Sequence, residues 1–207
     1  MKINFTKERK LYLISDRDIA CLSHSAIAKK ALTAGVKIIQ LREKKLSKKE
    51  IFAEASSIRK FTRSHNAILI INDYIDIALA VDADGVHLGQ DDMPMKEARK
   101  ILGNKRIIGI STHSVKQAVK AQEEGADYIG FGPIFHTSTK DAGRPKGLKM
   151  LEEVRRNISI PIAAIGGITS DTASKVLSSG ADAVAVGSAI LRGDMKNNID
   201  IFLSVIK

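Results

Sequence analysis

Two cations lie close together in the segment Gln40-Leu41-Arg42-Glu43-Lys44 and could bind a phosphorylated ligand. If this segment ends a strand, the two-residue period places Arg42 and Lys44 on the same side. A guanidinium holds phosphate oxygens with two parallel donors, and an ammonium acts as a compact charge, so the pair suits a diphosphate. A salt bridge to Glu43 at the strand end is the competing interpretation.

A pair of aspartates is the second candidate for chemistry. Asp73 follows the apolar run 67–72, and Asp92 follows the run 85–89. Two facing carboxylates repel each other, whereas a Mg²⁺ ion between them and a diphosphate would balance the charge. Paired aspartates are also common on surface loops, and Asp91 could take the place of Asp92.

Glycine and hydroxyl residues follow three later apolar runs. The segments IGGIT (165–169) and VGSAI (186–190) would let backbone N–H groups approach a phosphate, although glycine could also merely turn the chain. Their joint occurrence after two successive strands favours phosphate. His136-Thr137-Ser138-Thr139-Lys140 follows the run 128–135 and is either a solvated loop or part of the same anion site.

The histidines and the cysteine indicate no metal cluster, because no pair has metal-ligand spacing and neither GxSxG nor HExxH occurs. We expect His24 and His65 to face solvent and His87 to be a satisfied core or pocket histidine. His113 follows the fifth expected strand and could act as an acid or base. Cys21, the only cysteine, is expected to be a buried structural thiol.

Short β-branched runs alternate with segments of helical period along the chain. The expected strands are residues 11–15, 37–43, 67–72, 85–89, 106–111, 128–132, 161–166 and 183–187. The segments of helical period are residues 27–35, 49–64, 75–81, 96–103, 115–125, 148–156, 172–180 and 198–207. Four units share one joint, in which a helix stops at Gly or Asp and an uncharged strand follows, at 34–41, 82–89, 125–132 and 180–187.

Near-continuous apolar strands separated by helices are typical of a parallel sheet covered on both faces. Repetition of this unit predicts a (β/α)8 TIM barrel, with residues 1–207 as one domain. An open doubly wound sheet is the alternative, but no GxGxxG follows the first strand. Active sites of TIM barrels lie at the carboxyl ends of the strands, where this chain carries the cations, carboxylates, hydroxyls and glycines.

The net charge of +10 fits an anionic partner. The positive residues are scattered and only 4% of residues are aromatic, so phosphorylated small molecules are favoured over nucleic acid. Aliphatic runs are too short for a membrane span or a signal peptide, and a single cysteine suits a reducing compartment. We therefore expect a cytoplasmic protein without nucleic-acid or membrane partners; the oligomeric state is not predicted.

Six segments, in this order and spacing, resemble the thiamine phosphate synthase family. They are QLREK (40–44), INDYIDIALAVDADGVHLGQDDMP (71–94), IGISTHS (108–114), GADYIGFGPIFHTSTK (125–140), IPIAAIGGIT (160–169) and GADAVAVGSAI (180–190). The resemblance implies a transferase with the (β/α)8 fold. It would couple 4-amino-2-methyl-5-hydroxymethylpyrimidine diphosphate to 4-methyl-5-(2-phosphooxyethyl)thiazole by a Mg²⁺-assisted dissociative substitution that releases diphosphate.

The resemblance also assigns site residues, matched one by one to this sequence. The pyrimidine diphosphate would be bound by Gln40, Arg42, Lys44 and Asn72, Mg²⁺ by Asp73 and Asp92, the diphosphate oxygens by Ser111 and Lys140, and the thiazole phosphate by Thr137, Thr139, Gly167, Gly187 and Ser188. Arg42, Lys44, Ser111 and Lys140 would stabilise the leaving group, where negative charge develops. No nucleophile or acid–base pair is required for this chemistry.

Three alternatives remain open at the level of sequence. The thiazole tautomerase paralogue isomerises a carboxylated thiazole phosphate and is similar in its phosphate loops, with a histidine where this chain has His113. Retention of Asn72, Asp73 and Asp92 favours the synthase over it. A nucleic-acid-binding protein and a barrel that binds a phosphorylated metabolite without catalysis are the others. The segment 141–147 is more basic than is typical of the family, and we expect its charges to be solvated.

Overall fold

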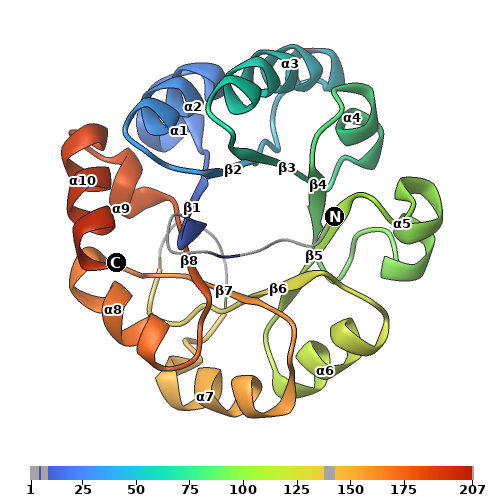
Figure 1. Ribbon diagram of the computed structural model, residues 1–207, viewed down its shortest axis with the longest axis vertical. Coiled ribbons are helices and arrows are strands. Elements are labelled where there is room, and N and C mark those ends of the chain that lie inside the picture. The colour runs from blue at the N-terminus through green and yellow to red at the C-terminus, as the bar shows by residue number, and fades with distance from the viewer. Residues whose placement is uncertain (1–4, 6–8, 138–142, 207) are drawn as a thin grey trace.

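Eight parallel strands close into a barrel in the order β1 to β8, with β8 hydrogen-bonded back to β1 (Figure 1). The computed structural model describes Phe5, residues 9–137 and residues 143–206. The strands are β1 Leu11–Ile14, β2 Ile38–Leu41, β3 Ile68–Asn72, β4 Gly85–Leu88, β5 Ile107–Thr112, β6 Tyr128–Phe131, β7 Ile162–Ile165 and β8 Ala183–Val186. Each overlaps an expected strand, so the predicted (β/α)8 barrel is confirmed.

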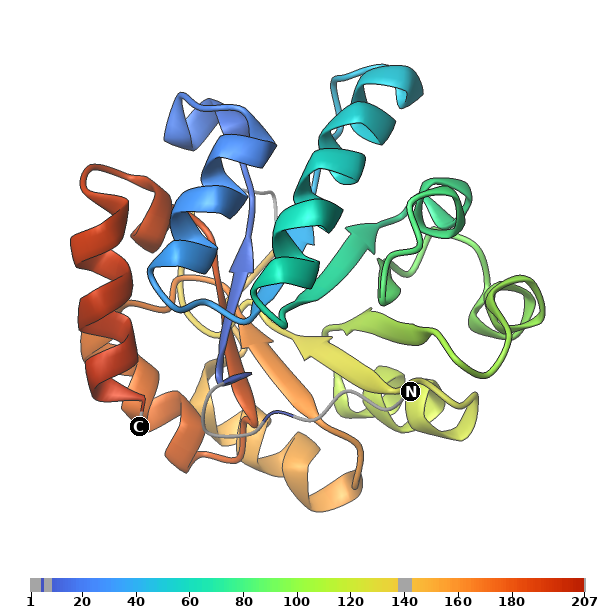
Figure 2. The same cartoon turned by 45° about the horizontal axis from the view of Figure 1, so that its top comes forward.

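Helices fill the connections and form the outer ring (Figures 1 and 2). They are α1 Arg17–Ala20, α2 His24–Thr33, α3 Lys48–Ser64, α4 Ile75–Ala80, α5 Met95–Leu102, α6 Val115–Glu123, α7 Gly147–Asn157, α8 Ser170–Ser178, α9 Ser188–Leu191 and α10 Met195–Val205. Side-chain caps fix several starts, such as Ser23 for α2 and the Ser47–Glu50 capping box for α3. The four-residue helices α1 and α9 were not predicted, because so short a segment has no readable period.

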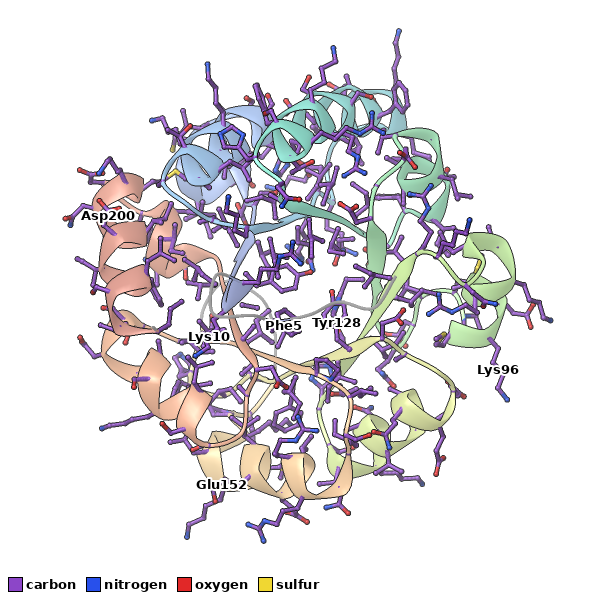
Figure 3. All side chains as sticks on the ribbon, viewed as in Figure 1. Phe5, Lys10, Lys96, Tyr128, Glu152 and Asp200 are labelled. Atoms are coloured by element: carbon purple, nitrogen blue, oxygen red, sulfur yellow. The ribbon has the colours of Figure 1, made fainter. Side chains whose placement is uncertain are left out.

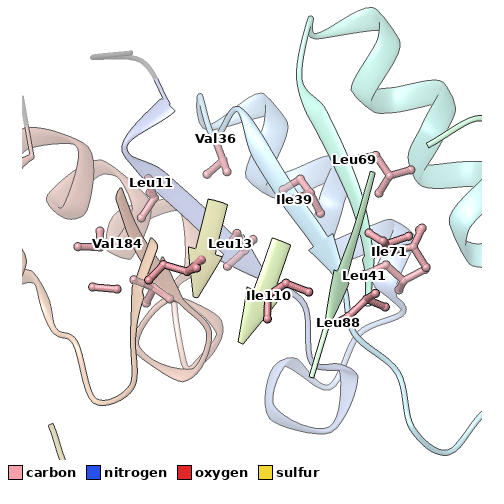
Figure 4. Close-up of a cluster of buried hydrophobic side chains, with 14 of the residues drawn as sticks. Leu11, Leu13, Val36, Ile39, Leu41, Leu69, Ile71, Leu88, Ile110 and Val184 are labelled. Atoms are coloured by element: carbon pink, nitrogen blue, oxygen red, sulfur yellow. The ribbon is translucent and has the colours of Figure 1, made fainter. Parts of the chain in front are cut away.

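Alternate strand residues face two separate cores. One set, including Tyr12, Ile38 and Tyr128, fills the barrel interior, where Figure 3 shows Tyr128 beside Phe5. The other set packs beneath the helices, as Leu13 and Ile39 do in Figure 4. Successive side chains along each strand therefore alternate between the interior of the barrel and the helical layer.

The four helix-to-strand joints expected from the sequence share a left-handed residue. Gly35, Gly125 and Gly180 have φ of 101°, 90° and 103°, and Asp82 takes the same place in its joint with φ of 56°. Glycine reaches this region without the strain that a side chain adds. The recurring Gly or Asp is thus explained by backbone geometry and needs no ligand.

Three aspartates tie the strands together at the amino-terminal end of the barrel. Asp84, Asp127 and Asp182 accept the N–H groups of Leu69, Ile108 and Ile162 at 2.8, 2.9 and 2.8 Å. Each also pairs with an arginine of α3, α5 or α7, namely Arg59, Arg99 and Arg155 at 2.8, 2.6 and 3.1 Å. These groups lie at the barrel end opposite the strand carboxyl termini and are structural.

The prediction for Cys21 was wrong, because its side chain is exposed. Cys21 caps the end of α1 with a left-handed φ of 51°. The average burial of cysteine misled the prediction because α1 itself was not foreseen. Within the described part of the chain, the helices are too short or too polar to cross a membrane.

Candidate active site

A cavity of about 550 Å³ opens at the carboxyl ends of the strands. Its lining includes Tyr12, Tyr128 and Ala163 of the barrel interior together with residues of the loops that follow the strands. Eight predicted site residues line it: Gln40, Arg42, Asn72, Ser111, Thr137, Gly167, Gly187 and Ser188. Three others, Lys44, Asp73 and Asp92, do not line the cavity, and Thr139 and Lys140 fall outside the described residues.

The glycine loops after β7 and β8 differ in why they need glycine. Gly167 has a left-handed φ of 65°, and a methyl group there would overlap the carbonyl oxygen of His136. The turn itself therefore requires Gly167. At Gly187 φ is −119°, and an added Cβ would make an ordinary contact of 3.5 Å with the carbonyl oxygen of Ile14. Packing therefore does not demand glycine at 187, and the bare backbone there lets a ligand approach closely.

Asp73 and Asp92 are brought together as the sequence predicted. The two carboxyl groups are close enough to shift each other's pKa, Lys44 pairs with Asp73, and the N–H of Gly89 donates to Asp92 at 2.6 Å. Burial, reinforced by the neighbouring Asp92, raises the pKa of Asp73 despite the opposing hydrogen bond from Lys44. Burial acts in the same direction on Asp92, but the interaction with Asp73 and the hydrogen bond from Gly89 outweigh it and lower its pKa. Holding two carboxyl groups this close disfavours the state in which both are ionised, and a bound cation would relieve that repulsion.

His24 does not face solvent, contrary to the prediction. It is 1% exposed, with Nδ1 2.8 Å from the Ser15 hydroxyl and Nε2 3.0 Å from a carboxylate oxygen of Glu43. Ser15 in turn accepts the N–H of Arg42 at 3.4 Å. The prediction failed because α2 begins at His24, three residues before the first residue we assigned to that helix, and so points the ring into the barrel wall.

Among the described residues, Glu43 pairs with His24 and forms no salt bridge with Arg42 or Lys44, which was the competing interpretation of this segment. Its other oxygen accepts the N–H groups of Lys44 and Lys45 at 2.7 and 2.6 Å. Burial alone would raise the pKa of Glu43, but the hydrogen bonds from Lys45, His24 and Lys44 overcome burial and lower it to about 2. This ionised carboxylate holds the loop that carries both predicted cations.

Polar side chains form a continuous chain across the barrel interior. The Gln40 amide donates to the Tyr12 hydroxyl at 2.7 Å, and the Tyr12 and Tyr128 hydroxyl oxygens are 2.9 Å apart. His87 lies between Tyr128 and Ser111, with Nδ1 2.9 Å from one hydroxyl and Nε2 2.9 Å from the other. The prediction of a satisfied pocket histidine at 87 is confirmed.

Of the other three histidines, two line the cavity and one lies at the end of α3. His113 lines the cavity after β5, and its Nδ1 is 2.7 Å from the carbonyl oxygen of Gly132. His136 also lines the cavity. His65 is half-buried at the end of α3, with Nδ1 2.9 Å from the Phe61 carbonyl oxygen, so the expectation that it faces solvent holds only in part.

Sequence reasoning missed several groups at the site. Tyr12 and Tyr128 were assigned only to strands, although a phenol among the aliphatic residues of LYLI and YIGF was the available signal. Arg192 follows α9 and lines the cavity. The pair of His24 and Glu43 joins residues distant in sequence and had no local signature.

The fold and the site define a TIM-barrel protein whose cavity is built from strand-end loops, with a carboxylate pair beside it. Residues 11–190 match the family described as thiamine monophosphate synthase. The chain is 45% identical over 196 residues to a thiamine-phosphate synthase of Chloroflexus aurantiacus, covering 94% of this chain and 90% of that protein. It is 49% identical over 184 residues to one of Methanospirillum hungatei, covering 87% and 89%.

A solved structure agrees with these sequence comparisons. Thiamine phosphate pyrophosphorylase from Pyrococcus furiosus superimposes with a TM-score of 0.90 at 37% identity, covering 98% of each chain. The chain belongs to the thiamine monophosphate synthase family and is a transferase.

Proposed function

We propose that this enzyme joins 4-amino-2-methyl-5-hydroxymethylpyrimidine diphosphate to 4-methyl-5-(2-phosphooxyethyl)thiazole, giving thiamine phosphate and diphosphate. One observation carries the proposal, namely the placement of the Asp73–Asp92 pair beside the cavity lined by Arg42 and the two glycine loops. Acidic and phosphate-binding groups so close together suit a ligand that carries diphosphate with its metal ion. The printed names of the relatives support the same product.

The two substrates would occupy different parts of the cavity. Gln40 and Asn72 are only 3% and 8% exposed, and their amides can bind a pyrimidine ring whose diphosphate extends to Arg42 and Lys44. The thiazole phosphate would meet Thr137, Thr139 and the backbone of Gly167, Gly187 and Ser188. For Thr139 the assignment rests on the family resemblance, since it lies outside the described residues.

The proposed reaction is a dissociative substitution at the pyrimidine methylene carbon. The bond from this carbon to the diphosphate oxygen breaks, and its electron pair leaves with the diphosphate. The lone pair of the thiazole nitrogen then forms the new carbon–nitrogen bond. Arg42, Lys44, Ser111 and Lys140 would donate to the diphosphate oxygens as charge develops on them, while the shared cavity holds the two reacting atoms close together.

Asp73 and Asp92 fit a Mg²⁺ ion. Magnesium prefers carboxylate and phosphate oxygens and keeps several waters, so two carboxylates and a diphosphate suffice. Among the described residues there is no cluster of three or more His, Cys, Asp or Glu that could hold a metal, so diphosphate and water oxygens would have to complete the coordination. When bound, the ion would neutralise charge on the diphosphate.

The test is a coupling assay. The protein would be mixed with both phosphorylated precursors and Mg²⁺, and thiamine phosphate measured with and without a chelator. We expect product that disappears on chelation. Absence of product with Mg²⁺ would refute the proposed reaction, and product unaffected by chelation would refute the metal role of Asp73 and Asp92.

The tautomerase alternative is supported by one feature, the location of His113 in the cavity wall after β5. Incubation with the carboxylated thiazole phosphate alone separates the two functions. Isomerisation without any pyrimidine diphosphate would favour the tautomerase, whereas the synthase leaves that compound unchanged under these conditions.

A further inference from the structure

In the chain of hydrogen bonds from Gln40 to Ser111, the donor of each bond follows from the number of hydrogens that each group carries. Gln40 donates to the Tyr12 hydroxyl, so the hydrogen of Tyr12 needs an acceptor elsewhere, and its other partner is Tyr128. Burial raises the pKa of both phenols above the ordinary range, so each is a neutral hydroxyl with one hydrogen to donate. Tyr128 must then donate to Nδ1 of His87.

The direction continues to the cavity. Because His87 accepts at Nδ1, its hydrogen is on Nε2, and this N–H donates to the Ser111 hydroxyl oxygen 2.9 Å away. The hydrogen of Ser111 is then left to point into the cavity that Ser111 lines. In the reverse direction Ser111 would donate to His87 instead, and the buried hydrogen of Tyr12 would have no acceptor among its two partners.

Two strand glycines make room for this chain. A methyl group at Gly109 would overlap the ring of Tyr128, and one at Gly130 would come within 2.9 Å of the His87 ring. Both glycines lie in the middle of strands, where they weaken the sheet relative to a residue with a side chain. Glycine at 109 and 130 thus weakens the two strands locally but leaves space for the rings of Tyr128 and His87.

We propose that Tyr128 and His87 are positioning residues, which fix the Ser111 hydroxyl as a hydrogen-bond donor to a diphosphate oxygen. The inference rests on the proposed function, since the ligand is the diphosphate of the substrate. Neither residue is required to touch the reacting atoms. Each acts through Ser111, whose hydroxyl would otherwise turn inward and present only lone pairs to an anion.

The first test measures the His87 tautomer in the wild-type protein. Long-range proton–nitrogen NMR in mildly alkaline buffer, with the signal assigned by its loss in His87→Gln, distinguishes hydrogen on Nε2 from hydrogen on Nδ1. We expect the Nε2–H form. Finding the Nδ1–H form would overturn the inference, and this result does not depend on whether any tyrosine variant folds.

The second test is a double-mutant cycle with inorganic diphosphate and Mg²⁺ as the probe, measured by calorimetry. Tyr128→Phe should weaken binding by about three- to tenfold, the range expected for one hydrogen bond. In the Ser111→Ala background the same change should have almost no further effect, because Tyr128 acts through that hydroxyl. Equal effects in both backgrounds would show a merely structural role and overturn the inference.

Tyr12→Phe is the matched control, since it also removes a buried phenol hydroxyl. Without Tyr12, Tyr128 still has His87 as its acceptor, so the Nε2–H tautomer and the diphosphate affinity should persist. Loss of both in Tyr12→Phe would overturn the inference. If the wild-type protein forms no thiamine phosphate and binds no diphosphate, the proposed function fails together with this inference. If it does both but the cycle is additive, only the inference fails.

Discussion

His24 and Glu43 form a buried pair, with Nε2 of the imidazole 3.0 Å from a carboxylate oxygen. Glu43 lies between Arg42 and Lys44 in the sequence, and the pair is buried beneath this segment. Through Ser15 it reaches the N–H of Arg42, and through the second carboxylate oxygen it holds the N–H groups of Lys44 and Lys45. The loop that carries the two cations is therefore held by a buried network of side-chain and backbone hydrogen bonds.

Glu43→Gln should lower the free energy of unfolding at neutral pH by roughly 3 kcal/mol. The pKa of Glu43 falls from its ordinary 4.5 to about 2 on folding, so its contribution is fully present above about 4.5 and is lost as pH falls towards 2. The stability difference between wild type and variant should therefore shrink across that window in urea unfolding experiments. Glu97→Gln, which alters an exposed carboxylate paired with Lys100, is the control and should show little difference at any pH.

The same Glu43→Gln change should affect the two substrates unequally. A less ordered cation loop would raise KM for the pyrimidine diphosphate by about three- to tenfold, while KM for the thiazole phosphate changes little. Steady-state kinetics with each substrate varied in turn checks this. An equal rise in both KM values would mean that the pair supports the whole barrel and not this loop.

Asp92→Asn should abolish most Mg²⁺-dependent turnover, by about a hundredfold or more, because the amide removes one of two charges facing the ion. Asp91→Asn provides a matched control, since Asp91 is the exposed neighbour of Asp92. We expect it to retain turnover and the same dependence on Mg²⁺ concentration. If the two variants behave in reverse, the metal ligand is Asp91.

Alanine at the two loop glycines should separate folding from binding. Gly167→Ala introduces a side chain at left-handed φ against the His136 carbonyl, so it should lower the free energy of unfolding by about 1–3 kcal/mol. Gly187→Ala has room for its methyl group and should cost less stability than Gly167→Ala while weakening binding of the thiazole phosphate. Thermal unfolding and equilibrium binding, measured on both variants, check the contrast; normal binding in Gly187→Ala would contradict it.

Asp127→Asn should weaken the protein without altering its chemistry. Asp127 accepts the N–H of Ile108 and pairs with Arg99 at the barrel end away from the cavity. Replacing the carboxylate should cost about 1–3 kcal/mol of unfolding free energy. At temperatures below thermal unfolding of the variant, kcat and both KM values should match the wild type. A change in any of the three would indicate that the two ends of the barrel are coupled.

The strands and most helices were predictable from the sequence because alternation of apolar runs with helical periods dictates a parallel barrel almost by itself. The strand-end rule then gathered Gln40, Arg42 and Ser111 around one cavity without knowledge of contacts. Side-chain partners were harder to foresee. Lys44 turned out to be paired with Asp73, a contact between residues 29 positions apart in the chain.

The errors have a common physical cause. Cys21 and His24 were judged by the average behaviour of their residue types, but the unforeseen helix α1 exposes one and the earlier start of α2 buries the other. In the same way, the partner of Glu43 depends on where a helix starts and not on strand alternation. Short elements and helix starts carry weak periodic signals, so residues next to them are the least predictable from sequence.

Gly109 and Tyr128 are paired neighbours on β5 and β6, and the ring of Tyr128 fills the space that a side chain at 109 would need. Relatives of this enzyme should therefore change the two positions together. A chain with alanine or serine at the position of Gly109 should carry a residue smaller than tyrosine at that of Tyr128. Paired substitutions at these two positions in different organisms would therefore show how the space inside the barrel is kept filled.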